Sequence, residues 1–445
     1  MRYLVFLIIF FISLKCGGSQ MVTSKMDWIN KQTIYEVNLR QYTEDGTISS
    51  FRLHLPRLKE MGFGILWFMP IHPIGEKNRK GELGSYYSVK DYFAVNPEFG
   101  TAEEFKSLVN EIHKMGMYVI IDWVANHTAC DNEMVSANPE WYTKDKNGSF
   151  QPPLGTDWSD VYDLDYTNLE LRQYMIDAME YWVKEYDIDG FRCDVAGMVP
   201  TDFWESAVER LNVIKPVFML AEWEDPDLLE KAFKADYNWS LYHILKDISS
   251  LKKDVNSIRQ YFENPKKKYP DRALKMNFLD NHDENSWNRV MIEHFGNKVY
   301  PLSTMLFTLP GIPMIYSGQE ARVEEKIKFF EKDTIQWNHY PDGNFYKNLI
   351  NIRKKHSVFW SNNTTLEFLD GLHSEVVGFK RWDSKNIYYV ILNFSNQTQE
   401  IDSELLSDNY IIKDENSTGN LLASNGYFIL KQKNKNMFKI SSYDF

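Results

Sequence analysis

The sequence predicts an α/β fold: a parallel (β/α)₈ barrel of the TIM type, with an insertion after the third strand and an antiparallel β-sandwich domain at the C-terminus. Two observations lead to this prediction. Apolar runs of strand length alternate with amphipathic helical patterns over about 320 residues, which is the size of such a barrel. From about Thr364 onward, β-rich runs and a hairpin signal at Asn425-Gly426 replace that alternation. A doubly wound open sheet is the alternative interpretation of the first pattern.

The barrel strands are expected where the short apolar runs occur. These runs lie at residues 34–37, 65–68, 118–121, 190–193, 217–221, 276–279 and 314–316, with a weaker run near 237–239. Helical patterns separate them, and Thr101 with Glu104 forms a capping box at the start of one helix that Gly116 ends. We therefore expect the barrel within residues 27–355 and a second domain at residues 364–445.

The insertion is expected at residues 128–166. This segment contains Pro152-Pro153, Gly148 and Gly155, and it shows no clear helical period. Connections of this length are usually functional or form a small subdomain.

The N-terminus carries a targeting signal. Arg2 is followed by an apolar run at 3–14, which is too short for a transmembrane helix, and then by Cys16. This pattern resembles a bacterial lipoprotein signal, so we expect residues 1–16 to be a signal peptide, Cys16 to be lipidated and residues 17–26 to form a tether. An ordinary secretory signal is the alternative. Either way the protein is expected outside the cytoplasm, and the lipid anchor is its one expected membrane contact.

Charge and composition narrow the classes of partner. The chain has 50 basic and 62 acidic side chains, a net charge of −12, so it would repel the phosphate backbone of nucleic acids. Aromatic residues make up 15% of the chain, which suits either stacking on flat ligands or core packing. Neutral sugars therefore remain open as ligands.

Four apolar runs end in, or lead directly into, acidic residues. The run at 118–121 precedes Asp122, and those that follow precede Asp194, Glu222 and the segment Asp280-Asn281-His282-Asp283. Because all strands of a barrel point the same way, these carboxyl groups are expected to converge on the face where barrel enzymes have their active sites.

Such a set of acids suits cleavage of a glycosidic bond. One carboxyl group must protonate the leaving oxygen, and another must attack the anomeric carbon or activate water. Arg192 lies two residues before Asp194 on the same strand face, so its charge is expected to keep Asp194 ionised. Glu222, neutral in a drier pocket, would then act as the acid.

On these residues the chain resembles the α-amylase family of glycoside hydrolases. The matching motifs cover residues 28–350 in the family's order. They are Asp122-Trp-Val-Ala-Asn126-His127, Gly190-Phe-Arg192-Cys-Asp194, Ala221-Glu222-Trp223, Asn281-His282-Asp283, Gly311-Ile-Pro313 with Gly318-Gln-Glu320, and Gly84-Ser-Tyr-Tyr87-Ser-Val-Lys-Asp91-Tyr.

The resemblance implies a role for each matched residue. Asp194 would be the nucleophile that forms a covalent glycosyl intermediate, Glu222 the acid and then the base, and Asp283 the residue that stabilises the transition state. Substrate-binding roles are implied for five more residues: Tyr87, Asp122, His127, Arg192 and His282. Asn126 and Asp163 fall where calcium-binding members have ligands, so Ca²⁺ is a possible cofactor, although both residues could equally cap loop turns. No organic cofactor is implied.

The expected function is retaining hydrolysis of α-1,4-linked glucans or maltooligosaccharides. Many family α-amylases carry a Lys-His pair shortly after the nucleophile, whereas Asp194 is here followed by Val195-Ala196-Gly197-Met198. The missing pair argues against internal cleavage of starch. Two alternatives stay open: a transglycosylase or isomerase that uses the same intermediate, and a carbohydrate-binding protein with an inactive barrel.

Overall fold

The computed structural model describes residue 26, residues 28–414 and residues 417–433. The expected signal peptide with Cys16, and the tether up to residue 25, lie outside the described residues. Lipidation and location therefore stay predictions. Among the residues that the structure describes, no helix is both long and apolar enough to cross a membrane.

Eight parallel strands close into a barrel, as the sequence predicted, and the open sheet is excluded. The order around the barrel is β1-β10-β9-β8-β7-β6-β3-β2. The strands are β1 (Ile34–Val37), β2 (Ile65–Phe68), β3 (Tyr118–Trp123), β6 (Gly190–Cys193), β7 (Phe218–Ala221), β8 (Ala235–Tyr237), β9 (Leu274–Asn277) and β10 (Ile312–Tyr316). For β9 the sequence prediction, 276–279, lies two residues too late, because residues 278 and 279 belong to the loop that carries Asp283.

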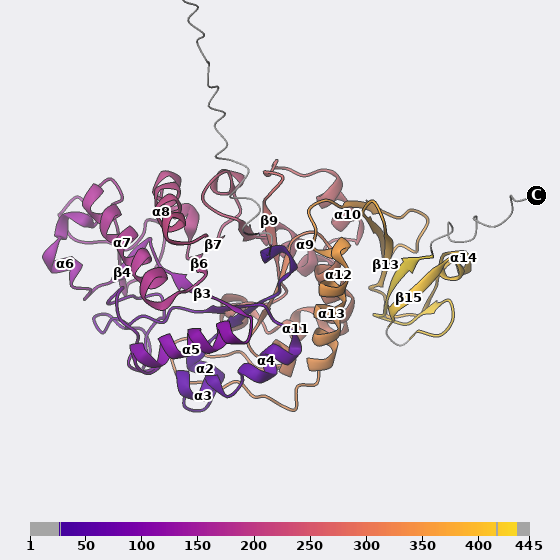
Figure 1. The fold of residues 1–445 in the computed structure, drawn as a ribbon, viewed down its shortest axis with the longest axis horizontal. Helices are drawn as coiled ribbons and strands as arrows, with labels where there is room; N and C mark the ends of the chain where they lie inside the picture. The colour runs from indigo at the N-terminus through magenta and orange to yellow at the C-terminus, as the bar shows by residue number, and fades with distance from the viewer. Residues whose placement is uncertain (1–25, 27, 415–416, 434–445) are drawn as a thin grey trace, which may run out of the picture.

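Helices surround the barrel (Figure 1). The longer ones are α5 (Ala102–Lys114), α7 (Leu169–Tyr186), α8 (Thr201–Ile214), α9 (Trp239–Ser249), α10 (Asn256–Glu263), α12 (Val299–Thr308) and α13 (Gly343–Lys355). Shorter ones are α2 (Leu39–Tyr42), α3 (Ile48–Arg52), α4 (Leu55–Met61) and α11 (Met291–Phe295). The capping box expected at Thr101 and Glu104 is present at the start of α5.

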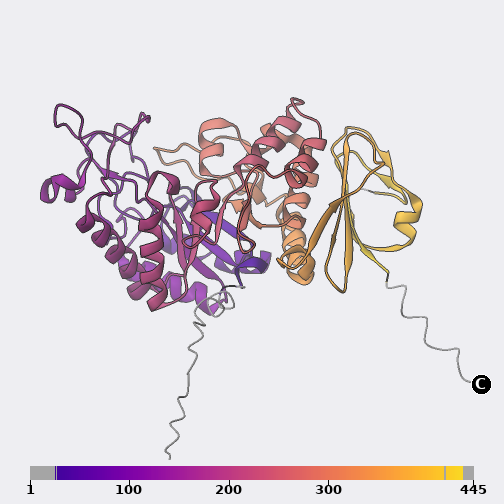
Figure 2. The same cartoon turned by 90° about the horizontal axis from the view of Figure 1, so that it is seen from above.

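The segment after β3 forms an excursion from the barrel. Strand β4 (His127–Ala129) pairs antiparallel with β5 (Val161–Asp163), and α6 (Met134–Ala137) lies between them in the chain. Both views place α6 and its neighbouring loops at the end of the molecule opposite the C-terminal domain (Figures 1 and 2). Because β4 starts at His127, this excursion is tied directly to the barrel edge that carries Asp122.

The C-terminal domain is antiparallel, as predicted. Its larger sheet has the order β11-β12-β13-β17-β15 and its smaller one pairs β14 with β16. The strands are β11 (Thr365–Phe368), β12 (Val376–Trp382), β13 (Ile387–Asn393), β14 (Gln399–Glu400), β15 (Asn409–Asp414), β16 (Leu421–Leu422) and β17 (Tyr427–Gln432), with helix α14 (Ser403–Ser407). Ile391 and Phe428 of the larger sheet bury their side chains in one cluster with Leu422 of the smaller. The smaller sheet, β14 with β16, is therefore the second layer of the sandwich.

Arg381 joins this domain to the barrel. Its buried guanidinium donates to the backbone oxygens of Thr308 and Val358, each at 2.8 Å, and to Thr364 Oγ1 at 2.6 Å. Removing the donor would leave buried carbonyl groups without partners, which costs free energy because water cannot replace the lost bonds.

We therefore expect Arg381→Met to lower the free energy of unfolding by about 3 kcal/mol in a denaturant titration. Lys380→Met, which removes the neighbouring cation on the same strand, should change it far less, because the Lys380 ammonium makes an exposed pair with Glu367 and a cation–π contact with Trp382 rather than buried hydrogen bonds. Equal stabilities of the two variants would contradict this role for Arg381.

Candidate active site

A pocket of about 580 Å³ opens at the C-terminal ends of the barrel strands. Six residues singled out from the sequence line it: Tyr87, His127, Asp194, Glu222, His282 and Asp283. The other lining residues are Lys80, Ser85, Asp157, Trp158, Asp160, Val161, Val195, Trp287, Phe329 and Phe330. The structure thus brings together side chains that are almost 200 positions apart in the chain, from Tyr87 to Asp283.

The guanidinium of Arg192 lies beneath this pocket and is fully buried. Its Nη1 donates to Asp122 Oδ1 at 2.8 Å and to Asp194 Oδ1 at 3.1 Å. Its Nη2 forms an ion pair with Glu222 Oε1 at 2.7 Å. One cation therefore contacts three carboxyl groups from three neighbouring strands, and it holds Asp194 and Glu222 close to each other.

Asp122 connects Arg192 to the side of the pocket formed by Tyr87. The second oxygen of Asp122, Oδ2, accepts from Tyr87 Oη at 3.0 Å and from Trp67 Nε1 at 3.2 Å. Tyr87 Oη also lies 2.8 Å from His282 Nε2, and the two rings stack with centroids 5.3 Å apart. These contacts fix the orientation of Tyr87 before any ligand binds.

His282 carries a positive charge at neutral pH. Burial lowers the pKa of its imidazole, but the carboxylates of Asp283 and Glu36 outweigh burial and raise that pKa to about 9. The Asp283 contact joins Oδ2 to His282 Nε2 at 3.5 Å, and 41% of the Asp283 side chain stays exposed to the pocket. Asp283 is therefore the most open of the three candidate catalytic acids.

Burial raises the pKa of both Asp194 and Glu222. For Asp194 the neighbouring charge of Glu222 raises the pKa further, while Arg192 opposes both effects. Arg192 lowers the pKa of both carboxyl groups, whereas burial, together with the charge of Glu222 acting on Asp194, opposes charging both at once. These opposing effects favour a state in which one carboxyl group is charged and the other holds a proton. The expectation that the proton resides on Glu222 stays a prediction, because the shared guanidinium does not by itself select the charged partner.

Glu222 has a second, directional contact. The backbone N–H of Val195 donates to Glu222 Oε2 at 2.8 Å. Val195 has φ +34°, a left-handed conformation that β-branched residues seldom adopt. The turn after Asp194 therefore aims a backbone donor at the neighbouring acid.

Aromatic rings form the walls of the pocket. Trp158, from the insertion, lies against His127 with ring centroids 5.2 Å apart. On the other side, Phe329 stacks on Tyr87 at 6.3 Å and contacts Trp287 at 5.1 Å. Trp287 is 52% exposed, so this wall offers ring faces to a ligand.

Sequence reasoning missed three buried partners of the site. They are Glu36 on β1, which bonds His282 Nδ1, Trp67 on β2, which bonds Asp122, and Tyr237 on β8, whose hydroxyl accepts from Arg192 Nε at 3.1 Å. Glu36 had a signal that could have revealed it, since a lone acid inside a buried apolar strand needs a partner. Trp67 and Tyr237 look like ordinary barrel residues.

Asn126 and Asp163, the residues proposed for calcium, have contacts within the protein. Asp163 Oδ2 accepts from Thr143 at 2.8 Å, and the side-chain amide of Asn126 lies 3.4 Å from His127 Nδ1. Asp160, three residues before Asp163, is paired with Lys80 at 3.3 Å. Within the described part of the chain, no three His, Cys, Asp or Glu side chains are grouped to hold a metal. Ca²⁺ takes about six to eight oxygen ligands, and the protein contacts of Asp163 and Asp160 argue against such a set without testing it, so calcium binding stays a prediction.

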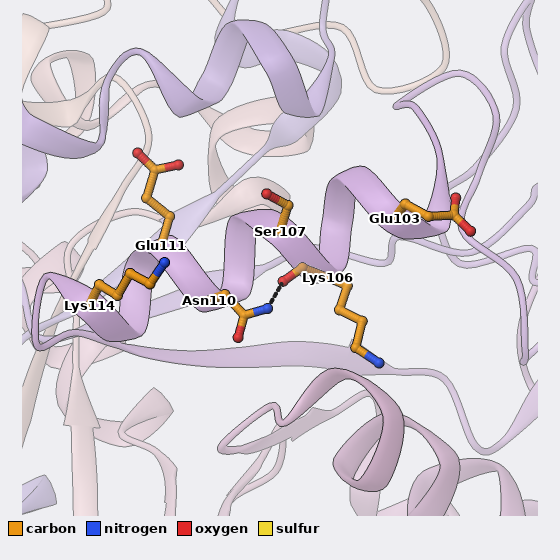
Figure 3. A pocket seen from close by; sticks show the side chains of 6 residues that line it. All are labelled: Glu103, Lys106, Ser107, Asn110, Glu111 and Lys114. Atoms are coloured by element: carbon orange, nitrogen blue, oxygen red, sulfur yellow. Dashed lines mark hydrogen bonds between the residues drawn. The ribbon is translucent and has the colours of Figure 1, made fainter.

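A second hollow, of about 550 Å³, lies on the outer face of α5 (Figure 3). All six of its lining side chains come from that one helix: Glu103, Lys106, Ser107, Asn110, Glu111 and Lys114. No other described helix or strand contributes a side chain to its lining, so residues from distant parts of the chain do not meet here as they do at the barrel mouth.

Comparisons with known proteins agree with the geometry. The family model described as the α-amylase catalytic domain matches residues 29–147 and 133–356. A solved α-amylase from Lactobacillus plantarum is 31% identical with a TM-score of 0.83, over 92% of this chain and 100% of that one. A solved maltogenic α-amylase from Thermotoga neapolitana is 32% identical with a TM-score of 0.78, over 91% and 97% of the two chains.

Two curated relatives are longer than this chain. An α-amylase from Haloarcula japonica is 24% identical over 83% of this chain, and an intracellular maltogenic amylase from Bacillus subtilis is 26% identical over 78%. The matched regions span 56% and 61% of those relatives.

We expect His282 to make stability depend on pH. Its folded pKa of about 9 exceeds the ordinary 6.5, so its contribution is complete below pH 6.5 and is lost as the pH rises to 9. In denaturant titrations the wild type should lose up to ~3 kcal/mol across that window, and His282→Gln should lose less. His127→Gln is the matched control. Burial lowers the pKa of His127 to about 4, so the imidazole stays neutral throughout, and this variant should keep the wild-type slope.

We expect EDTA to leave the melting temperature and the activity unchanged, because the acids near Asn126 and Asp163 already have protein partners. A melting temperature that rises with added CaCl₂ and falls again with EDTA would contradict this expectation.

Proposed function

The chain belongs to the α-amylase family, and on that premise we propose that it is a retaining α-glycoside hydrolase that cleaves α-1,4 links in glucans or maltooligosaccharides. The observation that carries the proposal is the contact of Asp194 and Glu222 with the two terminal nitrogens of one buried guanidinium. Retaining glycosidases need their two carboxyl groups close together, so that one attacks directly without an intervening water.

In the first step a carboxylate oxygen of Asp194 attacks the anomeric carbon. The bond from that carbon to the leaving oxygen breaks, and Glu222 gives its proton to this oxygen. In the second step water attacks the same carbon, its proton passes to Glu222, and the bond to Asp194 breaks. Two displacements at one carbon restore the α configuration.

An acid must still hold its proton at the working pH, and the raised pKa of Glu222 is compatible with that role. Because the pKa of Asp194 is raised too, the assignment of the proton to Glu222 rests on the family resemblance. Asp283, with His282 beside it, faces the pocket and would bind hydroxyl groups of the attacked sugar. Tyr87, held by Asp122 and His282, would support the face of that sugar. Arg192 lies too deep to bind substrate and would act by orienting the two acids.

The relatives favour glucan substrates. Two solved relatives that this chain covers almost completely are named α-amylase and maltogenic α-amylase, and two curated relatives are named cyclomaltodextrinase and malto-oligosyltrehalose trehalohydrolase. We infer that short maltooligosaccharides are the substrates, because Trp158 and Trp287 contribute aromatic rings to the pocket lining.

A second candidate function is transfer of the glycosyl group to a sugar, in a transglycosylase or isomerase, because the same intermediate can react with a hydroxyl group other than that of water. An inactive binding protein is disfavoured, since all three acids line the pocket.

The experiment that separates these functions is product analysis on defined maltooligosaccharides, starch, pullulan, cyclodextrins, sucrose and trehalose. Hydrolysis gives new reducing ends that are first released as α anomers, visible by early NMR spectra. Longer oligosaccharides would indicate transfer, and an inverted product would exclude the two-step mechanism.

We expect Asp194→Asn and Glu222→Gln to lower kcat by about three orders of magnitude or more, without a loss of folded structure by circular dichroism. Asp227→Asn, the same chemical change at an exposed position outside the pocket, should leave kcat unchanged. Near-normal activity of Asp194→Asn would remove it as the nucleophile.

A further inference from the structure

The indole of Trp223, the residue after Glu222, rests on a glycine. A Cβ placed on Gly197 would lie 2.2–2.4 Å from Cε2, Nε1 and Cδ2 of the Trp223 ring. These three atoms belong to the five-membered ring, so Gly197 lies against the face of the indole. No larger residue leaves room for the ring there, and Trp223 is still 38% exposed. One side of the indole is thus supported by protein while much of the residue stays open.

We infer that this ring lies on the side from which the leaving group departs, next to Val195 and Glu222, which line the pocket. Gly197 belongs to the short helical turn Ala196–Met198, which follows Asp194. The turn is tied to the acid twice, by Val195 N–H to Glu222 Oε2 at 2.8 Å and by Ala196 N–H to Glu222 O at 3.2 Å. Glu222 must reach the leaving oxygen to protonate it, so the departing sugar lies on this side. The attacked sugar lies on the side of Tyr87 and His282.

The same turn offers a departing sugar no charged group. Residues 195–198 are Val, Ala, Gly and Met, and Met198 is 37% exposed. Hydroxyl groups of a sugar would find neither an ammonium nor an imidazole here. The available surface is an aromatic face with an apolar neighbour, which suits the flat C–H face of a glucose ring.

We propose that Trp223, seated on Gly197, is the stacking platform for the leaving-group sugar and determines specificity on that side of the scissile bond. The inference rests on the proposed function and adds a binding residue to it. Trp223 takes no part in bond making, so its effect should depend on the presence of a departing sugar.

Two substrates with the same donor part separate this effect from the chemistry. Maltotriose releases glucose, whereas α-maltosyl fluoride releases fluoride, which needs neither a platform nor a proton from a sugar-binding acid. We expect Trp223→Ala to lower kcat/KM about tenfold for maltotriose and less than twofold for α-maltosyl fluoride. Trp223→Phe should restore part of the loss.

Gly197→Ala tests the support of the ring. Its methyl group would overlap the indole, so the ring must move, and the variant should lose activity on maltotriose while keeping that on the fluoride. Trp382→Ala, which removes an indole from β12 in the C-terminal domain, is the matched control and should leave both substrates unaffected.

The outcomes are distinct. A selective loss on maltotriose in Trp223→Ala and Gly197→Ala supports the platform. Equal losses on both substrates, or no loss on either, would overturn it while leaving the proposed function intact. A wild-type protein that turns over neither substrate would overturn the proposed function and the platform with it.

Discussion

The site depends on one buried cation. Arg192 is enclosed in the barrel, where a charge is stable only when paired, and it contacts Asp122, Asp194 and Glu222 at 2.7–3.1 Å. One positive charge cannot neutralise three negative charges in a dry interior. Asp122 is fully buried and hydrogen-bonded through both oxygens. The excess negative charge therefore lies on Asp194 and Glu222, the two acids that face the pocket. A proton retained between Asp194 and Glu222 relieves it, which is the state that a nucleophile and an acid need together.

The barrel supplies the geometry that this cation requires. In the strand register Asp122 lies opposite Arg192, and Cys193 lies opposite Ala221, so Asp194 and Glu222 leave adjacent strands at the same level. Parallel strands deliver all these side chains to one edge. His282 and Glu36 form a second buried ion pair at this edge, and Tyr87 bridges the two pairs through its hydroxyl group.

The sequence was sufficient to predict the barrel, the C-terminal antiparallel domain and the acids at the strand ends, because each depends on local patterns: apolar runs, strand-ending carboxylates and a hairpin turn. The sequence did not predict that Glu36, Trp67 and Tyr237 take part in the site, because they do so through contacts with residues far away in the chain. The calcium prediction stays open. The positions of Asn126 and Asp163 can be read from a motif, but the contact of Asp163 with Thr143 and that of Asp160 with Lys80 appear only in three dimensions.

The turn after Asp194 links local backbone conformation to the geometry of the site. A left-handed valine costs about 1–3 kcal/mol of conformational energy, and such strain persists only where the surroundings fix it. Here Val195 N–H donates a hydrogen bond to Glu222, the proposed acid, and the turn that Val195 begins brings Gly197 under Trp223. The same short segment thus orients the acid through its backbone and shapes the adjoining surface through its missing side chain. If Trp223 binds the departing sugar as proposed, substitutions at Gly197 and Trp223 change substrate choice on that side, while Arg192 continues to hold the two acids in place.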